Sequence, residues 1–256
     1  MIPARMMRWA SLLGAVAVAS AWHPLTIPTG TEIVRSMHDK YAGKWFKTLT
    51  FVQKTTRQTK DGKDTVAAWY EAASLPGRLR IDLGKPSEGN GVLYTHDSTY
   101  RMQAGVLAQA SAGGNPLIPL LFDVYAVPVD RTIADVKNTL KIDLSKVSQS
   151  TWDGRPVYII GANPGDEKAP QVWIDTERLV VLRQIFVVGD TSLTYIDSQF
   201  KQYRPIGQSW IAPQCEFYID GKLLQREEYT EIKADVPLSE ALFDPAQWKT
   251  APHWLH

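Results

Sequence analysis

The amino-acid sequence predicts a mainly β protein with a few helices: a curled antiparallel sheet, an unclosed half-barrel of roughly ten or eleven strands, plugged by short helices. The main observation is the stretch from Trp152 to Tyr229, where apolar-rich runs alternate with turn residues and no helical period intervenes. The pairs Asp153-Gly154 and Asp220-Gly221 suit two-residue hairpin turns. Strands joined in this way form an antiparallel meander, and a long meander must curl or be covered because flat open sheets expose their edges.

Residues 1–21 are typical of a cleaved secretory signal peptide. Arg5 and Arg8 form a basic start, and the uncharged stretch Trp9–Ala21 ends in the small-x-small pattern of a cleavage site. That stretch is shorter than the roughly 20 residues that a membrane-spanning helix needs. We therefore expect residues 22–256 to form a single exported domain, soluble in the periplasm and monomeric.

Charge and cysteine content exclude several classes of partner. The chain has 28 Lys and Arg against 27 Asp and Glu, with no basic stripe, which argues against a nucleic-acid partner. The only cysteine, Cys215, cannot form an internal disulfide. Cys215 shares one strand face with Phe217 and Ile219, so we expect a buried, inert thiol.

The mature chain should begin with a helix. Thr29 and Glu32 match a capping box, apolar residues then recur at helical spacing to Tyr41, and Gly43 should end the helix. Four strands are predicted to follow in the N-terminal half: 45–58, 65–73, 78–83 and 97–102.

Two of these strands alternate cleanly between apolar and charged residues. The apolar set should face the concave interior and the charged set should face outward, because successive side chains of a strand point to opposite faces. The apolar set is Leu79, Ile81, Leu83, Tyr100 and Met102. The charged set is Arg78, Arg80, Asp82 and Arg101.

The β pattern breaks between residues 104 and 142. Ala104–Gly114 is rich in Gly, Ala and Ser and is predicted to be a mobile loop. Asn115-Pro116 then favours a helix start, and the helix Pro116–Tyr125 should be apolar nearly all round. Asp130 can cap a second helix. We interpret the first helix as a lid over the sheet, with the Gly-rich stretch as its hinge.

Six further strands are predicted in the second half, followed by an irregular tail, 237–256, that packs against a rim of the sheet. The strands are 155–161, 170–175, 179–188, 192–200, 214–220 and 222–233.

The sequence offers few candidate catalytic residues. His96-Asp97-Ser98 holds triad residue types, but triad members meet in space rather than as neighbours in a turn. Glu227 and Glu228 are adjacent on a strand and point to opposite faces, which is typical of a solvated strand end. The five histidines lack metal-ligand spacing. We therefore predict no enzyme, no metal and no cofactor.

Aromatic and aliphatic residues are abundant, with nine Trp, ten Tyr and seven Phe. Several strands, such as 180–188, are apolar on both faces, whereas a sheet with one face in water alternates more strictly. Either the helices pack on these additional apolar residues as ordinary core, or the residues line a cavity for an apolar ligand. Composition leaves both open.

The order of these segments resembles the LolA-type family of periplasmic lipoprotein-sorting carriers (LolA/LolB/LppX-like half-barrels) over nearly the whole mature chain. The motifs that carry the resemblance are short: Leu75-Pro76-Gly77-Arg78, the segment His96–Met102, Asn115-Pro116-Leu117, Gln171–Asp175, and Val236-Pro237-Leu238 with Leu242–Pro245. Leu75 departs from the pattern, because the best-known carriers have Arg there, where it helps to hold the lid shut. No lipid-attachment Cys follows the signal, so the chain resembles a soluble carrier rather than an anchored receptor.

The resemblance implies an unclosed barrel whose helices line an apolar cavity for acyl chains. Its expected function is lipoprotein sorting or lipid transfer, with a lipidated protein or lipid as cargo and, as further partners, an inner-membrane transporter and an outer-membrane receptor. The alternative is an envelope regulatory or interaction module with the same fold and no transported lipid. The expected ligand-binding residues are Leu79, Ile81, Leu83, Tyr100, Met102, Leu117, Ile118, Leu121, Phe122, Leu182, Phe186, Leu193 and Tyr195.

Overall fold

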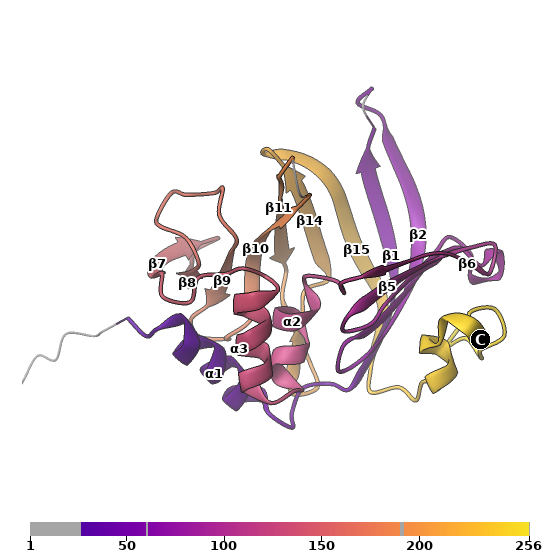
Figure 1. The fold of residues 1–256 in the computed structure, drawn as a ribbon, viewed down its shortest axis with the longest axis horizontal. Helices are drawn as coiled ribbons and strands as arrows, with labels where there is room; N and C mark the ends of the chain where they lie inside the picture. Colours follow the sequence, from indigo (N-terminus) through magenta and orange to yellow (C-terminus); the bar gives the residue numbers. More distant parts are fainter. Residues whose placement is uncertain (1–26, 60, 190–191, 256) are drawn as a thin grey trace, which may run out of the picture.

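A single large antiparallel sheet organises the molecule (Figure 1). The structure is a computed structural model that describes residues 27–59, 61–189 and 192–255. Among these residues the main sheet has 13 strands in the order β6-β5-β4-β3-β2-β1-β15-β14-β11-β10-β9-β8-β7, and a separate two-stranded sheet pairs β12 with β13. The strand bounds are β1 Thr48–Gln58, β2 Asp64–Ser74, β3 Arg78–Leu83, β4 Gly91–Tyr94, β5 Ser98–Gln103, β6 Val106–Ala112, β7 Val147–Trp152, β8 Arg155–Ile160, β9 Gln171–Asp175, β10 Val181–Val188, β11 Thr194–Lys201, β12 Arg204–Ile206, β13 Ser209–Ile211, β14 Gln214–Ile219 and β15 Lys222–Ala234.

The sheet is curled and unclosed, so the predicted fold class is confirmed. β6 and β7 are its two edges and do not pair with each other. The strand count was too low, because β4, β6, β7, β12 and β13 are short or weakly apolar and gave little signal. The Asp153-Gly154 and Asp220-Gly221 turns are confirmed: φ is 47° and 75° in the first and 49° and 72° in the second. The residues next to each turn pair directly, Trp152 with Arg155 and Ile219 with Lys222, and β14 and β15 then shift register between Phe217 and Tyr218.

The concave face is covered by three short α-helices and a 3₁₀ turn (Figure 1). α1 (Gly30–Tyr41) begins with the predicted capping box: the Glu32 amide donates to the Thr29 hydroxyl at 3.2 Å, and the Thr29 amide donates to the Glu32 carboxylate at 2.7 Å. α2 is Ile118–Leu121, the 3₁₀ helix η2 is Asp123–Tyr125, and α3 is Val129–Asn138. Their apolar sides pack on the strands to form the main core.

The region 104–125 differs from the prediction in two ways. Val106–Ala112 is not a mobile loop but the edge strand β6, which pairs with β5 and has every residue exposed. Small residues carry little strand propensity, so the pairing with β5 decides the conformation. The single helix expected over 116–125 is divided into α2 and η2 at Phe122, whose φ of −132° and ψ of −58° leave the helical region.

The outer face of β3–β5 is not exposed, contrary to expectation. The tail forms two 3₁₀ helices, η3 (Glu240–Phe243) and η4 (Pro245–Gln247), which pack over this face rather than against a rim (Figure 1). Arg80 and Asp82 do point away from the concave face, but the tail buries them to 2% and 1% exposure. Neither charge is buried without a partner, because the two residues form an ion pair and Arg80 also donates to backbone carbonyls of the tail.

The predicted signal peptide, 1–21, lies outside the described residues. Within the described part of the chain, no helix has both the length and the apolar character to cross a membrane.

Candidate functional site

A cavity of about 120 Å³ lies between the concave face of the sheet and the α2–η2 segment. Its wall is apolar and aromatic except for three polar side chains, Asn115, Glu71 and Glu227. The remaining lining residues are Trp45, Phe51, Leu79, Ile81, Leu117, Ile118, Leu121, Phe122, Tyr125, Val180, Val181, Phe200, Tyr203, Trp210, Ile211, Ala212, Cys215, Phe217 and Tyr229. The cavity is therefore an apolar space with very few polar groups, as is usual for a small-molecule site.

The η2 end of this covering segment is firmly anchored. The Gly77 amide donates to Asp123 Oδ1 at 2.8 Å, which ties η2 to the turn between β2 and β3. The Tyr125 ring stacks on Trp45 with centroids 3.7 Å apart, and its hydroxyl donates to the Leu179 carbonyl at 3.0 Å. The turn that carries Leu75 thus has a latch of its own, made by a backbone amide and a carboxylate.

The α2 end has fewer ties. Gln184 Nε2 donates to the Pro116 carbonyl at 3.0 Å. The Asn115 side chain accepts from the Leu117 amide at 3.0 Å and so closes a turn before α2, whereas the predicted helix start at Asn115-Pro116 is wrong, because α2 begins at Ile118. Otherwise α2 is held by apolar contacts to the core, in which Leu120 is fully buried.

Two carboxyl groups face the cavity from different strands. Glu71 on β2 lies opposite Phe51 of β1, and Glu227 on β15 lies opposite Thr55 of β1. Phe51 and Thr55 share one face of β1, so both glutamates project from the concave face on either side of this strand. The two side chains are only 5% and 7% exposed.

The two glutamates have different surroundings. Glu227 accepts from the Tyr229 hydroxyl at 2.6 Å and from the Gln225 amide group, and Arg57 Nε in turn donates to Gln225 Oε1 at 2.5 Å. Glu71, which lines the cavity, has no hydrogen bond or ion pair with any described residue. One carboxyl is therefore supported by donors and the other is not.

The pKa values of both groups are raised, for related reasons. Burial, and then the nearby Glu227, raise the pKa of Glu71 well above its usual range. Burial also raises the pKa of Glu227, while the hydrogen bonds from Tyr229 and Gln225 act in the opposite direction. Cys215 lies beside them, with Tyr229 Oη 3.3 Å from its Sγ, and burial raises the pKa of its thiol. The expectation of a buried thiol is confirmed.

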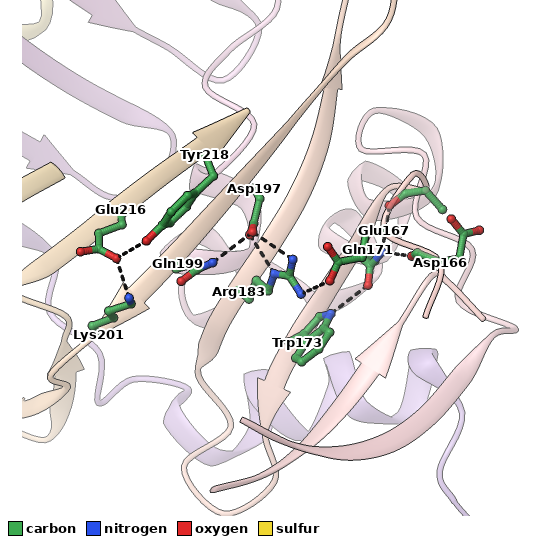
Figure 2. A network of polar contacts seen from close by, with 11 residues as sticks. Asp166, Glu167, Gln171, Trp173, Arg183, Asp197, Gln199, Lys201, Glu216 and Tyr218 are labelled. Atoms are coloured by element: carbon green, nitrogen blue, oxygen red, sulfur yellow. Dashed lines mark hydrogen bonds and ion pairs between the residues drawn. The ribbon is translucent and has the colours of Figure 1, made fainter. Parts of the chain in front are cut away.

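The outer face of β9–β14 carries a separate polar network, which Figure 2 shows. Arg183 pairs with Asp197 through two bonds of 2.8 and 2.9 Å, and Glu216 accepts from Arg226 at 2.8 Å and from Tyr218 at 2.7 Å. These groups satisfy one another and enclose no cavity that the structure describes, so they stabilise the sheet rather than form a site.

Six of the predicted ligand-binding residues line the cavity: Leu79, Ile81, Leu117, Ile118, Leu121 and Phe122. Leu83 shares their face of β3 but lies beyond the cavity, and Leu182 is buried in the main core. Phe186 lines a different hollow, beside Pro116 and Pro119. Leu193 is 56% exposed.

The remaining three predicted positions are on the wrong face. Tyr100 pairs with Leu93, and Leu93 and Met102 belong to the small core beneath the tail. Tyr100 and Met102 therefore face outward. Arg101, which lies between them on β5, faces inward. Tyr195 lies two residues before Asp197 on β11, so both side chains lie on the outer face of the sheet. Sequence alternation identifies two faces but cannot tell which is concave when both are covered.

Sequence reasoning missed the two glutamates. Glu227 was interpreted as part of a solvated strand end, but it is buried. Glu71 is the only charged residue between Thr65 and Pro76, and a single carboxyl within an otherwise uncharged strand was the signal that could have identified it.

Comparison with known proteins rests on structure. No family model and no curated protein sequence matches the chain. The fold is similar to that of a LolA superfamily protein from Nitrosomonas europaea, with a TM-score of 0.55, 11% identity, and coverage of 85% of this chain and 98% of the other. The chain has a LolA-like fold.

Two further structures share the LolA-like fold. One is a domain from Vibrio parahaemolyticus whose name assigns it to outer membrane lipoprotein sorting, with a TM-score of 0.55, 12% identity, and coverage of 86% and 98% of the two chains. The other is a DUF1329 family protein from Desulfovibrio piger, with a TM-score of 0.56, 14% identity, and coverage of 84% and 95%. At this identity the likeness concerns the fold alone.

Proposed function

We propose that the protein is a soluble periplasmic carrier that binds an apolar chain, from a lipoprotein or a free lipid, in the cavity beneath α2. The observation that carries the proposal is the cavity itself, because a well-packed core leaves few voids larger than a water molecule. The LolA-like fold supports a role in lipoprotein sorting or lipid transfer. Binding would draw about 0.8 kcal/mol from each buried CH₂ group, which gives a useful and reversible affinity without any catalytic group.

The size of the cavity implies that it opens. Its volume of about 120 Å³ is close to that of an engineered cavity of roughly 150 Å³ that holds benzene, so an acyl chain does not fit without movement. α2 is the candidate for this movement, because its ties to the sheet are few and its neighbour η2 is anchored. Leu121 and Phe122 would then contact the ligand.

The direct test is to purify the protein gently from its native host and analyse bound lipid by mass spectrometry. A cavity-filling variant, Ala212→Phe, is purified in parallel, since Ala212 lines the cavity and overpacking costs only about 1–3 kcal/mol. Leu224→Phe is the matched control, because Leu224 is 42% exposed and does not line the cavity. We expect lipid with the wild type and with Leu224→Phe and none with Ala212→Phe. Equal lipid content in all three would refute binding in this cavity.

The role of α2 is tested by two adjacent residues. Leu120 is fully buried core, whereas Leu121 lines the cavity. Leu120→Asp should unfold the domain, because it buries an unpaired charge. Leu121→Asp should lose binding of a fluorescent fatty acid while its melting temperature falls less. Unchanged binding in a folded Leu121→Asp protein would remove α2 from the binding site.

A further inference from the structure

The Glu71 carboxyl is a buried acid that faces an apolar cavity without a partner. Its side chain is 5% exposed, it lines the cavity wall, and no described residue donates a hydrogen bond to it. Leaving a buried polar group unsatisfied costs free energy, so such a group is expected where a ligand supplies the missing partner.

The second acid, Glu227, differs from Glu71 in its hydrogen-bond partners. Tyr229 and Gln225 donate to its two carboxylate oxygens, and such donors favour the ionised form. Glu71 has no such donors, and burial and then the nearby Glu227 raise its pKa well above the usual range. Negative charge is therefore better supported at Glu227 than at Glu71.

The other ionisable groups around the pair do not neutralise it directly. Arg57 on β1 reaches Glu227 only through Gln225. Tyr94 on β4, Cys215 on β14 and Tyr229 on β15 are buried or half-buried and uncharged at neutral pH, since burial raises the pKa of each. Arg101 on β5 lies on the same face and is exposed. The α2 segment, Ile118–Leu121, contributes no titratable group.

We infer that the cavity selects an amphiphile with an apolar chain and a primary ammonium head, which donates to the unpartnered Glu71 beside Glu227. The inference rests on the proposed function and specifies its ligand. An ammonium supplies both the missing donors and a compensating positive charge, and hydrogen bonds between charged groups are stronger than neutral ones. The rings of Phe51 and Tyr229, stacked with centroids 4.2 Å apart, line the same space and offer the aromatic surroundings that favour cations.

Other head groups fit less well. A carboxylate head would add a further negative charge beside Glu227, and an alcohol would supply a donor but no charge. A bare metal ion lacks ligands here, because no group of three or more metal-binding side chains occurs among the described residues.

Binding of the ammonium needs no covalent step. The head group enters in its charged form and donates N–H bonds to carboxyl oxygens of Glu71 and Glu227. Burial and Glu227 raise the pKa of Glu71, whereas a positive charge beside the pair favours ionised carboxylates, so amine affinity should rise with pH.

The experiment compares octylamine, 1-octanol and octanoic acid by isothermal titration calorimetry at pH 7, with the amine repeated at pH 6 and pH 8. The variants are Glu71→Gln, which removes the acid at nearly constant shape, and Glu228→Gln as the matched control. Glu228 neighbours Glu227 in sequence but lies on the outer face, where it pairs with Lys54.

We expect octylamine to bind about 10- to 100-fold more tightly than octanol, since a hydrogen bond to a charged group contributes this much. Glu71→Gln should abolish the preference while octanol binding changes less than about twofold. Glu228→Gln should behave like the wild type.

Failure of the inference and failure of the proposed function are distinguishable. If octanol or octanoic acid binds as tightly as octylamine, or if Glu71→Gln keeps the amine preference, the ammonium inference is overturned while the carrier proposal stands. If none of the three chains binds, both are overturned.

Discussion

The buried ion pair between Arg80 and Asp82 should be among the most sensitive positions in the protein. Arg80 donates through Nε at 2.8 Å and through Nη2 at 2.9 Å to the two carboxylate oxygens of Asp82. It also donates to the carbonyls of Leu242 and Trp248, and its guanidinium lies 3.8 Å from the Trp248 ring centre. One guanidinium thus joins β3 to the C-terminal tail.

Removing one partner should lower the free energy of unfolding by far more than the intact pair contributes to it. Asp82→Leu leaves a guanidinium that is 2% exposed without its counter-ion, and Arg80→Met leaves a carboxylate that is 1% exposed with only His253 Nε2, at 3.2 Å, as a side-chain partner. Breaking a buried pair in this way destabilises by about 3–5 kcal/mol. For a domain of this size that is a fall in melting temperature of roughly 6–20 °C, at about 2–4 °C for each kcal/mol.

The double variant Arg80→Met/Asp82→Leu separates the two contributions. It leaves no buried charge, so it should recover most of the loss, although the carbonyls of Leu242 and Trp248 lose a donor. Glu228→Gln is the exposed control, because the Lys54–Glu228 pair is 58% and 47% exposed and such pairs contribute about 0–1 kcal/mol. Urea denaturation of the four proteins provides the measurement. The reasoning is refuted if either single variant costs no more than the control, or if the double variant is as unstable as the single ones.

Three further predictions concern stability. Trp248→Ala should cost about 3–5 kcal/mol in urea denaturation, because the ring is 2% exposed and packs in the core beneath the tail; a loss below 1 kcal/mol would show that the tail is not part of the cooperative unit. The pKa of Glu216 is lowered to about 2, because bonds from Lys201, Tyr218 and Arg226 outweigh the opposing effect of burial. A lowered folded-state pKa stabilises above the unfolded value and this stability is lost as pH falls, so melting curves of the wild type should lose stability between about pH 4.5 and 2 more steeply than those of Glu216→Gln. The pKa of Glu71 is raised, so its effect on stability has the opposite pH dependence: its contribution to folding stability is complete in acid and is lost as pH rises. Glu71→Gln should therefore be more stable than the wild type at neutral pH. A less stable variant would contradict the assignment of an unpartnered acid.

Local patterns in the sequence determined much of the fold. The capping box at Thr29 and Glu32, the Asp-Gly turns and the alternation of β3 each depend on neighbours within a few residues, and the structure confirms them. The curled antiparallel sheet followed from the spacing of the strands, and six cavity-lining residues followed from the apolar faces of β3 and α2. These features arise from short-range chemistry, which a single sequence displays directly.

Only the tertiary structure decided which covered face became the site. Arg80 and Glu71 are both charged residues in neighbouring strands, yet the tail closes over one face and α2 over the other, so Arg80 forms a structural pair while Glu71 faces a cavity. Val106–Ala112, within the stretch expected to be a loop, forms an edge strand because β5 offers it hydrogen-bonding partners. Each of these outcomes depends on segments far apart in the chain, such as Arg80 with Trp248 and Glu71 with Glu227. The sequence of either segment alone does not specify what covers it, because burial and hydrogen-bond satisfaction are properties of the assembled fold.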